Sequence, residues 1–486
     1  MFQRIVTKFG LAAHLAMLAA IPCALTPFVP EQWLGDVTLW LALIAAIWVL
    51  LSPSIRVGEG VTQARLRVLG EILHDPVTWF FIVAGVVFWI AKANGAVELF
   101  YDAETTQWIV KKPPVEELPS STPGAGYLPL AVTVSLGVCV EGICHALGRQ
   151  ARTWCILAAS FIAGIGGFAL VTLVFQGIAP FEGAALRDFG DAPFLGSMFI
   201  PWLFAAIAGG SQAEAEGWGA SRLVYAVAVG GNVAAVAFLL PPVESAIILA
   251  VAAVFLLWSL FYSSRASGKG GAAARMLVMT VLGVLLAAFS MMLFAPDELR
   301  AAKSDQIFAA APEREPIEDT FDDEEDPTSD EVFARIARQM WLQSPWCGVG
   351  IGAYKVQLPF FAEDTDWRIL PVKAQWPQNS YWGILAERGI TGCAILGAGL
   401  AFLLVFWAVR AVQAFFAVRQ NDEHDIYPFA VQPISWGIIP ILVLCALDAR
   451  YSGILRFDAF AFAVAMPFAI ALAAFPRLKK KKEEPK

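Results

Sequence analysis

The chain has 486 residues, of which 58% are hydrophobic and 16% are charged, and its mean hydropathy is +0.63. This composition excludes a soluble globular protein, because apolar runs long enough to cross a bilayer recur along the whole chain. The formal net charge of -8 is concentrated in one acidic segment and therefore indicates little about partners. We expect no nucleic-acid partner. The sequence therefore predicts an all-α polytopic membrane protein.

Hydropathy predicts about 12 transmembrane helices along the chain. The first apolar run follows Arg4 and Lys8 and ends near Pro30. It lacks a small-x-small cleavage site followed by a polar mature start, which favours an uncleaved span over a signal peptide. The other spans are expected at residues 37–52, 77–91, 128–147, 156–177, 195–210, 223–240, 243–262, 276–295, 391–412, 428–447 and 459–475. This layout leaves one large loop between the ninth and tenth spans.

Positive side chains fall on one alternate set of the connecting loops. They include Arg4 and Lys8, the arginines between residues 56 and 67, Arg222, Arg275, and Lys479–Lys482 near the end of the chain. By the positive-inside rule, this set of loops and both termini are cytoplasmic. The large loop is then external, which means the periplasm if the protein lies in a bacterial inner membrane.

These features divide the chain into a bundle of nine spans (1–295), the periplasmic loop (296–390), three more spans (391–475) and a basic cytoplasmic tail (476–486). Within the loop, residues 296–331 include the run EPIEDTFDDEEDPTSDE, whose few apolar residues predict a flexible linker. The alternative is a cation site, but the run lacks the spaced ligands and central glycine of a calcium loop. The ordered, helical part of the loop is expected at 332–390.

This ordered part is expected to begin with an amphipathic helix. Thr328 and Glu331 fit a capping box, and one helical face carries the apolar residues Val332, Phe333, Ile336, Met340 and Trp341. The helix is expected to stop at Ser344-Pro345, before glycines that can approach a ligand closely. A second short helix is expected from Asn379, which is a good N-cap, to Gly389.

Two segments of this region, SPWCGVGIGAY and QNSYWGILAERGITG, resemble the signature of the O-antigen ligase and polymerase superfamily. The resemblance covers roughly Val332 to Leu400. It implies a metal-independent transfer of a glycan from a polyprenyl diphosphate to a lipid or saccharide acceptor at the outer face. In that family arginines hold the diphosphate and a histidine takes the proton of the acceptor hydroxyl. Here Gln378 stands at the position of the histidine, and Asp330 at that of an arginine that starts the amphipathic helix.

The catalytic candidates are Gln378, Glu387 and Arg388. All four histidines of the chain are expected at or near the cytoplasmic side, so none is expected to act as an outer base. Glutamine accepts no proton at neutral pH, so the base would be one of the carboxylates Glu387, Glu363, Asp364 or Asp366. Glu387 has an alternative role as a structural cap or as a partner of Arg388. Arg388 either reaches a lipid phosphate or offsets the dipole of its helix.

The candidate substrate-binding residues combine cations for a diphosphate, glycines for close approach, and polar or aromatic groups for sugars. They are Arg335, Arg338, Gly348, Gly350, Gly352, Lys355, Arg368, Lys373, Asn379, Tyr381, Trp382 and Arg450. For each cation the alternative is a charge that faces solvent or lipid headgroups. We expect membrane lipid and a lipid-linked glycan as partners, and neither a metal nor a cofactor.

Three functions are compatible with these residues. The first is a glycosyltransferase that uses a lipid-linked saccharide. The second is a catalytically silent relative that binds a glycan or acts as a scaffold for envelope proteins, which the replacement of the histidine by Gln378 favours. The third is a transporter, suggested by Glu141 and His145, which are one helical turn apart in the fourth span.

Overall fold

The computed structural model describes residues 60–74, 98–102, 107–111, 149–175, 196–215, 221–267, 271–294, 329–350, 354–362, 379–421 and 433–448, and single positions between 37 and 86. These parts are almost entirely helical, as the composition predicted. The exception is a hairpin that was not predicted, in which β1 (Glu98–Asp102) pairs antiparallel with β2 (Gln107–Lys111). Strand β1 carries the aromatic residues Phe100 and Tyr101, and β2 carries Trp108 with the β-branched Ile109 and Val110, which are typical of sheets.

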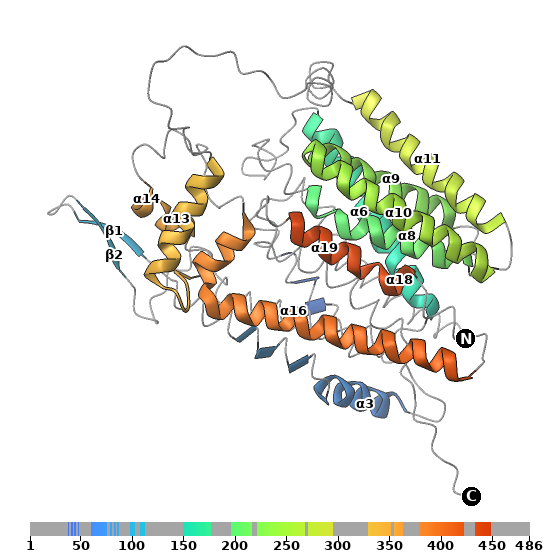
Figure 1. The fold of residues 1–486 in the computed structure, drawn as a ribbon, viewed down its shortest axis with the longest axis horizontal. Helices are drawn as coiled ribbons and strands as arrows, with labels where there is room; N and C mark the ends of the chain where they lie inside the picture. The colour runs from blue at the N-terminus through green and yellow to red at the C-terminus, as the bar shows by residue number, and fades with distance from the viewer. Residues whose placement is uncertain are drawn as a thin grey trace, which may run out of the picture.

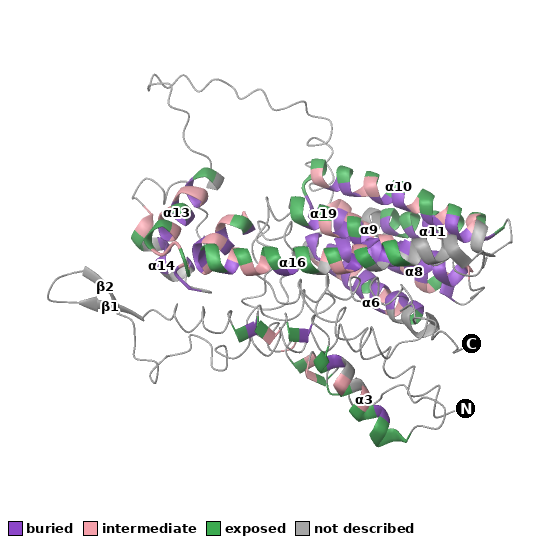
Figure 2. Ribbon diagram, turned by 60° about the horizontal axis from the view of Figure 1, so that its bottom comes forward, coloured by how far each residue is buried: buried purple, intermediate pink, exposed green. Residues whose placement is uncertain are grey.

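A bundle of helices forms one body of the molecule (Figure 1). It contains α6 (Arg149–Phe175), α8 (Ile200–Ala215), α9 (Ser221–Leu239), α10 (Pro242–Ser267) and α11 (Gly271–Phe294). Every residue of α8 from Ile200 to Glu214 is buried, so this helix is enclosed by its neighbours. Figure 2 shows that buried residues gather in this bundle.

Five helices of the described chain are long and apolar enough to cross a membrane, which makes this a multi-pass membrane protein. They lie at Ile156–Leu173, Ser221–Leu239, Pro242–Ser264, Gly271–Phe289 and Ser380–Gln413. They match the fifth, seventh, eighth, ninth and tenth predicted spans, and α8 occupies the position of the sixth. The first, fourth and twelfth spans lie outside the described residues, as do residues 296–328 of the acidic linker, so the count of twelve stays a prediction. The predicted end of the linker at residue 331 is wrong, because the helix that follows begins at Ser329.

Small residues let the backbones of α6, α9 and α11 touch. A Cβ atom on Gly231 of α9 would lie within 1.9 Å of the carbonyl oxygen of Gly164 in α6, and one on Gly230 would lie 2.5 Å from the carbonyl oxygen of Gly283 in α11. The buried Asn232 side chain donates a hydrogen bond of 3.2 Å to the backbone oxygen of Ser160 across the same interface. Close backbone packing of this kind is typical of helices within membranes.

An ion-pair cluster ties three helices together at the predicted cytoplasmic end of the bundle. Glu214, at the end of α8, is only 5% exposed and accepts hydrogen bonds from Arg222 of α9 and Arg275 of α11. Both arginines belong to the set that the positive-inside rule assigned to the cytoplasm. The structure shows that they also fix the ends of their helices against α8.

Three further elements complete the described chain. Helix α3 (Val61–His74) occupies the connection between the second and third predicted spans, where no helix was predicted. The eleventh predicted span is broken at Gly437 into α18 (Pro433–Trp436) and α19 (Ile438–Asp448). Helix α16 (Ser380–Asn421) runs from the loop along the bundle and kinks at Gly389. Beyond one end of the bundle lie α13 (Ser329–Gln343) and α14 (Tyr354–Phe361) (Figure 1).

Candidate functional site

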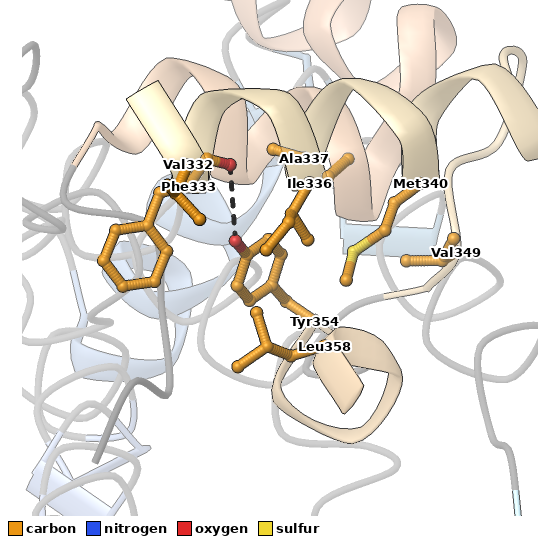
Figure 3. Close-up of a cluster of buried hydrophobic side chains, with 9 residues drawn as sticks. Val332, Phe333, Ile336, Ala337, Met340, Val349, Tyr354 and Leu358 are labelled. Atoms are coloured by element: carbon orange, nitrogen blue, oxygen red, sulfur yellow. Dashed lines mark hydrogen bonds between the residues drawn. The ribbon is translucent and has the colours of Figure 1, made fainter. Parts of the chain in front are cut away.

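Helices α13 and α14 and the first turns of α16 form a small folded body, which we call the loop unit (residues 329–350, 354–362 and 379–391). Its core is apolar and consists of Val332, Phe333, Ile336, Ala337, Met340, Val349, Tyr354, Leu358 and Ala386 (Figure 3). Four of the five apolar residues predicted to share a face of α13 lie in this core. The fifth, Trp341, is half-buried at its edge and donates a hydrogen bond of 3.2 Å to the Pro345 oxygen.

The predicted end of α13 and the predicted start of α16 are confirmed. Helix α13 stops at Gln343, directly before Ser344-Pro345. The Asn379 side-chain oxygen caps α16, because it accepts hydrogen bonds of 3.0 Å from the Tyr381 amide and 3.4 Å from the Trp382 amide. Thr328 lies outside the described residues, so the capping box at the start of α13 stays a prediction.

A crossing of two backbone segments joins the loop unit to the apolar part of α16. The amides of Ile390 and Thr391 donate hydrogen bonds of 2.9 and 3.1 Å to the carbonyl oxygens of Pro345 and Trp346. On the other side of the crossing, the amides of Val349 and Gly350 donate bonds of 2.9 and 3.0 Å to the carbonyl oxygens of Ala386 and Glu387. The turn after α13 is therefore fixed against the kink of α16.

Two glycines make this crossing possible. Gly348 and Gly389 have φ angles of 68° and 61°, in the left-handed region that other residues rarely adopt. A Cβ atom on Gly348 would lie 2.3 Å from the carbonyl carbon of Glu387, and one on Gly389 would lie 2.5 Å from the Gly348 nitrogen. We refer to this feature as the two-glycine crossing.

The crossing supplies a structural reason for glycines that the sequence analysis assigned to substrate. The amides of Gly348 and Gly350 donate to the Ser344 and Glu387 oxygens, at 2.8 and 3.0 Å. The close approach that glycine permits is thus made by the protein's own backbone. Binding of substrate at these two positions stays a prediction, and the third glycine of the run, Gly352, lies outside the described residues.

Glu387 is buried within the loop unit, with 2% of its surface exposed. Its Oε1 atom accepts a hydrogen bond of 3.2 Å from the amide of Tyr354, the first residue of α14. A carboxylate at this position satisfies one of the free amides of the helix and interacts favourably with the helix dipole. The geometry therefore fits the structural cap that the sequence left open as an alternative to a catalytic base.

Tyr354 is a core residue of the loop unit that was not predicted from the sequence. The ring is fully buried beneath α13, and the hydroxyl donates a long hydrogen bond of 3.5 Å to the Phe333 oxygen (Figure 3). Burial, with a further contribution from the charge of Glu387, raises the pKa of the Tyr354 hydroxyl well above its usual range. The spacing of Tyr354 and Leu358 at i and i+4 was the signal that could have identified the short helix α14.

The remaining candidates of α16 lie around the kink. Arg388 is half-buried beside Gly389, and Trp382 packs against the core of the loop unit. The exposed Tyr381 donates a hydrogen bond of 2.6 Å from its hydroxyl to the Ala446 oxygen of α19. This bond links the loop unit directly to a helix of the membrane body.

The cationic candidates divide into described and undescribed positions. On α13, Arg335 is half-buried and Arg338 is exposed, and Lys355 lies in the first turn of α14. Outside the described residues lie Gln378, Arg368, Lys373, Arg450 and the pair Glu141 and His145. Within the described parts of the chain, no group of three His, Cys, Asp or Glu residues is arranged to hold a metal ion.

No protein-family model matches the sequence, and no curated protein matches it significantly. The resemblance to the O-antigen ligase and polymerase superfamily thus rests on the two segments quoted above, whose described residues lie in the turn after α13, at the first residue of α14 and in the kinked start of α16. In the structure these segments contact each other at the two-glycine crossing.

Proposed function

We propose that the protein binds a glycan carried on a polyprenyl diphosphate at the outer face of the membrane and transfers it to a lipid or saccharide acceptor. The observation that carries this proposal is the position of Arg388. It lies one residue before the kink, where α16 passes from the loop unit into an uncharged apolar run. The head of a lipid whose tail stays in the bilayer lies at this same level.

The chemistry of this transfer needs few groups. The acceptor oxygen attacks the anomeric carbon of the donor sugar, the bond from that carbon to the diphosphate breaks, and the acceptor proton passes to a base. Guanidinium groups stabilise the diphosphate that leaves, because their paired N–H donors match its oxygens. Arg388 and the exposed Arg338 are the cations of the loop unit that we assign to this role.

A second function, binding without transfer, is favoured by the surroundings of Glu387. A base must reach the acceptor hydroxyl, whereas this carboxylate is buried and accepts the amide of Tyr354. Gln378 supplies no base at the position where the resembling family has a histidine. A silent relative that holds a lipid-linked glycan, or that acts as a scaffold in envelope assembly, would keep the arginines and need no base.

Binding and transfer can be measured separately on the full chain in proteoliposomes that contain a polyprenyl-diphosphate glycan. We expect the wild type to bind this lipid and Arg388→Ala to bind it at least tenfold more weakly, while Arg388→Lys keeps part of the affinity. Transfer by the wild type that Arg388→Ala abolishes would establish the enzyme. Binding without transfer would establish the silent relative. Equal affinities for all three proteins would overturn the proposal.

Gln378→His tests the missing base directly. A gain of transfer over the wild type would show that the site lacks only its proton acceptor. If the wild type already transfers glycan, Glu387→Gln separates the two roles of that residue, because the amide keeps an oxygen for Tyr354 but accepts no proton. Unchanged turnover in Glu387→Gln would leave Glu387 as a structural cap.

A further inference from the structure

We propose that three exposed apolar side chains around the two-glycine crossing, Leu342, Trp346 and Ile390, form an interfacial anchor. This anchor holds the loop unit in the headgroup region of the membrane leaflet next to it, which the distribution of positive charge makes the outer leaflet. The occupant of the anchor is the phospholipid surface itself. The inference does not depend on the proposed glycan chemistry.

The first observation is the exposure of these side chains. Trp346 is 70% exposed, Leu342 is 59% exposed and Ile390 is 42% exposed. Trp346 lies within a turn that backbone hydrogen bonds fix on both sides, from Thr391 to its own oxygen and from Ile390 to the Pro345 oxygen. A large aromatic ring that a fixed backbone holds outward, with two more exposed apolar side chains around the same crossing, is available for contact with an apolar surface.

The second observation is the level of the turn relative to the bilayer. The amides bonded to Pro345 and Trp346 belong to Ile390 and Thr391, the first residues of the uncharged run Ile390–Val409. At about 1.5 Å per residue, a helix of this length spans the ~30 Å hydrocarbon core of a membrane. Arg388 and Arg410 flank the run. The hydrogen bonds of the crossing therefore place the turn at one membrane–water interface.

The third observation is the chemistry of the side chains themselves. Tryptophan is enriched at membrane interfaces, where its apolar ring meets acyl chains and its N–H meets headgroups. Leu342 and Ile390 add apolar area of the kind that partitions into the acyl boundary. Arg338 is exposed one helical turn before Leu342 on α13, a spacing that suits contact with a lipid phosphate. If a second protein chain covered these side chains, they would not need to lie level with the start of an apolar span, whereas contact with the membrane surface requires that level.

The anchor can be tested with a fluorescent thiol dye on the full chain in lipid nanodiscs. The probe positions are Trp346→Cys and, as a matched control, Glu331→Cys, an exposed residue near the other end of α13; both carry Cys347→Ser. We expect lipids with a nitroxide at the headgroup to quench the dye at 346 at least twofold more than the dye at 331. Aqueous iodide should show the opposite preference.

Two results at position 346 would overturn the anchor. The first is equal quenching by iodide at both positions with no quenching by the nitroxide lipid, which would leave the turn in water. The second is protection from both quenchers at 346, which would show that a protein covers the turn.

Because Trp346→Cys removes an anchor residue, the same quenching is measured on native Cys347 with Trp346 intact, with Cys347→Ser as the blank. Lipid quenching at Cys347 is expected there too, and its absence would also overturn the proposal.

Discussion

At the residue scale, the backbone of Gly389 decides how the loop unit meets the membrane helix. Its φ of 61° lies in the left-handed region, and the space that a side chain would need is filled by the Gly348 nitrogen and the Trp346 oxygen. Both the strain of this conformation and the overlap act against any other residue. The kink of α16 is therefore a property of this one position.

Gly389→Ala should lower the free energy of unfolding of the loop unit by at least about 2 kcal/mol, from left-handed strain and overpacking together. Gly397→Ala is the matched control on the same helix, because a Cβ atom there would meet nothing within 4 Å. Thermal unfolding of both variants in detergent checks the prediction. Equal midpoints for the two variants would show that the crossing contributes no stability.

The raised pKa of the Tyr354 hydroxyl predicts that the stability of the folded protein decreases at alkaline pH. The pKa of this hydroxyl is raised in the folded protein, so the folded state keeps the proton at a pH where the unfolded tyrosine, with a pKa of about 10, loses it. The stability contributed by the neutral hydroxyl is fully present below pH ~10 and falls as the pH rises above that value.

Tyr354→Phe removes this titration. We expect a loss of less than about 1 kcal/mol at neutral pH, because the hydrogen bond to Phe333 is long, and a smaller decline of stability between pH 9.5 and 11 than in the wild type. Chemical denaturation across this range measures both. A decline as steep as that of the wild type would mean that another group controls the alkaline behaviour.

At this scale, the positions predicted correctly are those whose role follows from local backbone chemistry, and the contacts not predicted are those made by residues distant in sequence. Asn379 and Gly389 were predicted correctly because N-caps and left-handed helix ends depend on local chemistry. The cap of α14 was left open because Glu387 reaches Tyr354 across 33 positions of sequence. Pairings of this kind arise only from the folded packing.

At the element scale, the bundle depends on helices that approach through small residues. The interface between α6 and α9 is the tightest case, since a Cβ on Gly231 would overlap the backbone of Gly164. Gly231→Ala should separate the two helices and lower the stability of the bundle by roughly 1–3 kcal/mol.

The matched control for Gly231→Ala is Gly70→Ala in α3, where a Cβ atom would meet nothing within 4 Å. We expect this variant to unfold at the midpoint of the wild type or slightly above it, because alanine favours the helix more than glycine does. Thermal unfolding in detergent compares the two. A Gly231→Ala midpoint that matches this control would contradict backbone contact as the basis of the interface.

Hydropathy identified the long apolar helices because a helix that crosses the hydrocarbon core of a membrane carries about 20 consecutive, mostly apolar residues. It missed α3, whose sequence mixes arginines with apolar residues, and α14, which has only eight residues and contains Pro359. Proline is unfavourable inside helices, so the local pattern argued against an element that tertiary packing on α13 supports. The break at Gly437 in the eleventh predicted span was missed for the related reason that an apolar run does not reveal its kinks.

At the scale of the whole molecule, the structure combines a membrane bundle with the loop unit at the end of α16 (Figure 1). The link between them consists of the two-glycine crossing and the hydrogen bond from Tyr381 to Ala446 of α19. These contacts hold Arg388 where the chain enters its apolar run. Both the proposed glycan chemistry and the interfacial anchor depend on this placement.

The most direct test of this account is the side of the membrane on which α13 lies. Glu331→Cys in a Cys347→Ser background places one thiol at an exposed position of α13. In right-side-out membrane vesicles, we expect a membrane-impermeant maleimide to label this variant fully before permeabilisation and to label the Cys347→Ser parent at background level. Labelling of Glu331→Cys only after permeabilisation would put the loop unit on the cytoplasmic side and contradict the account.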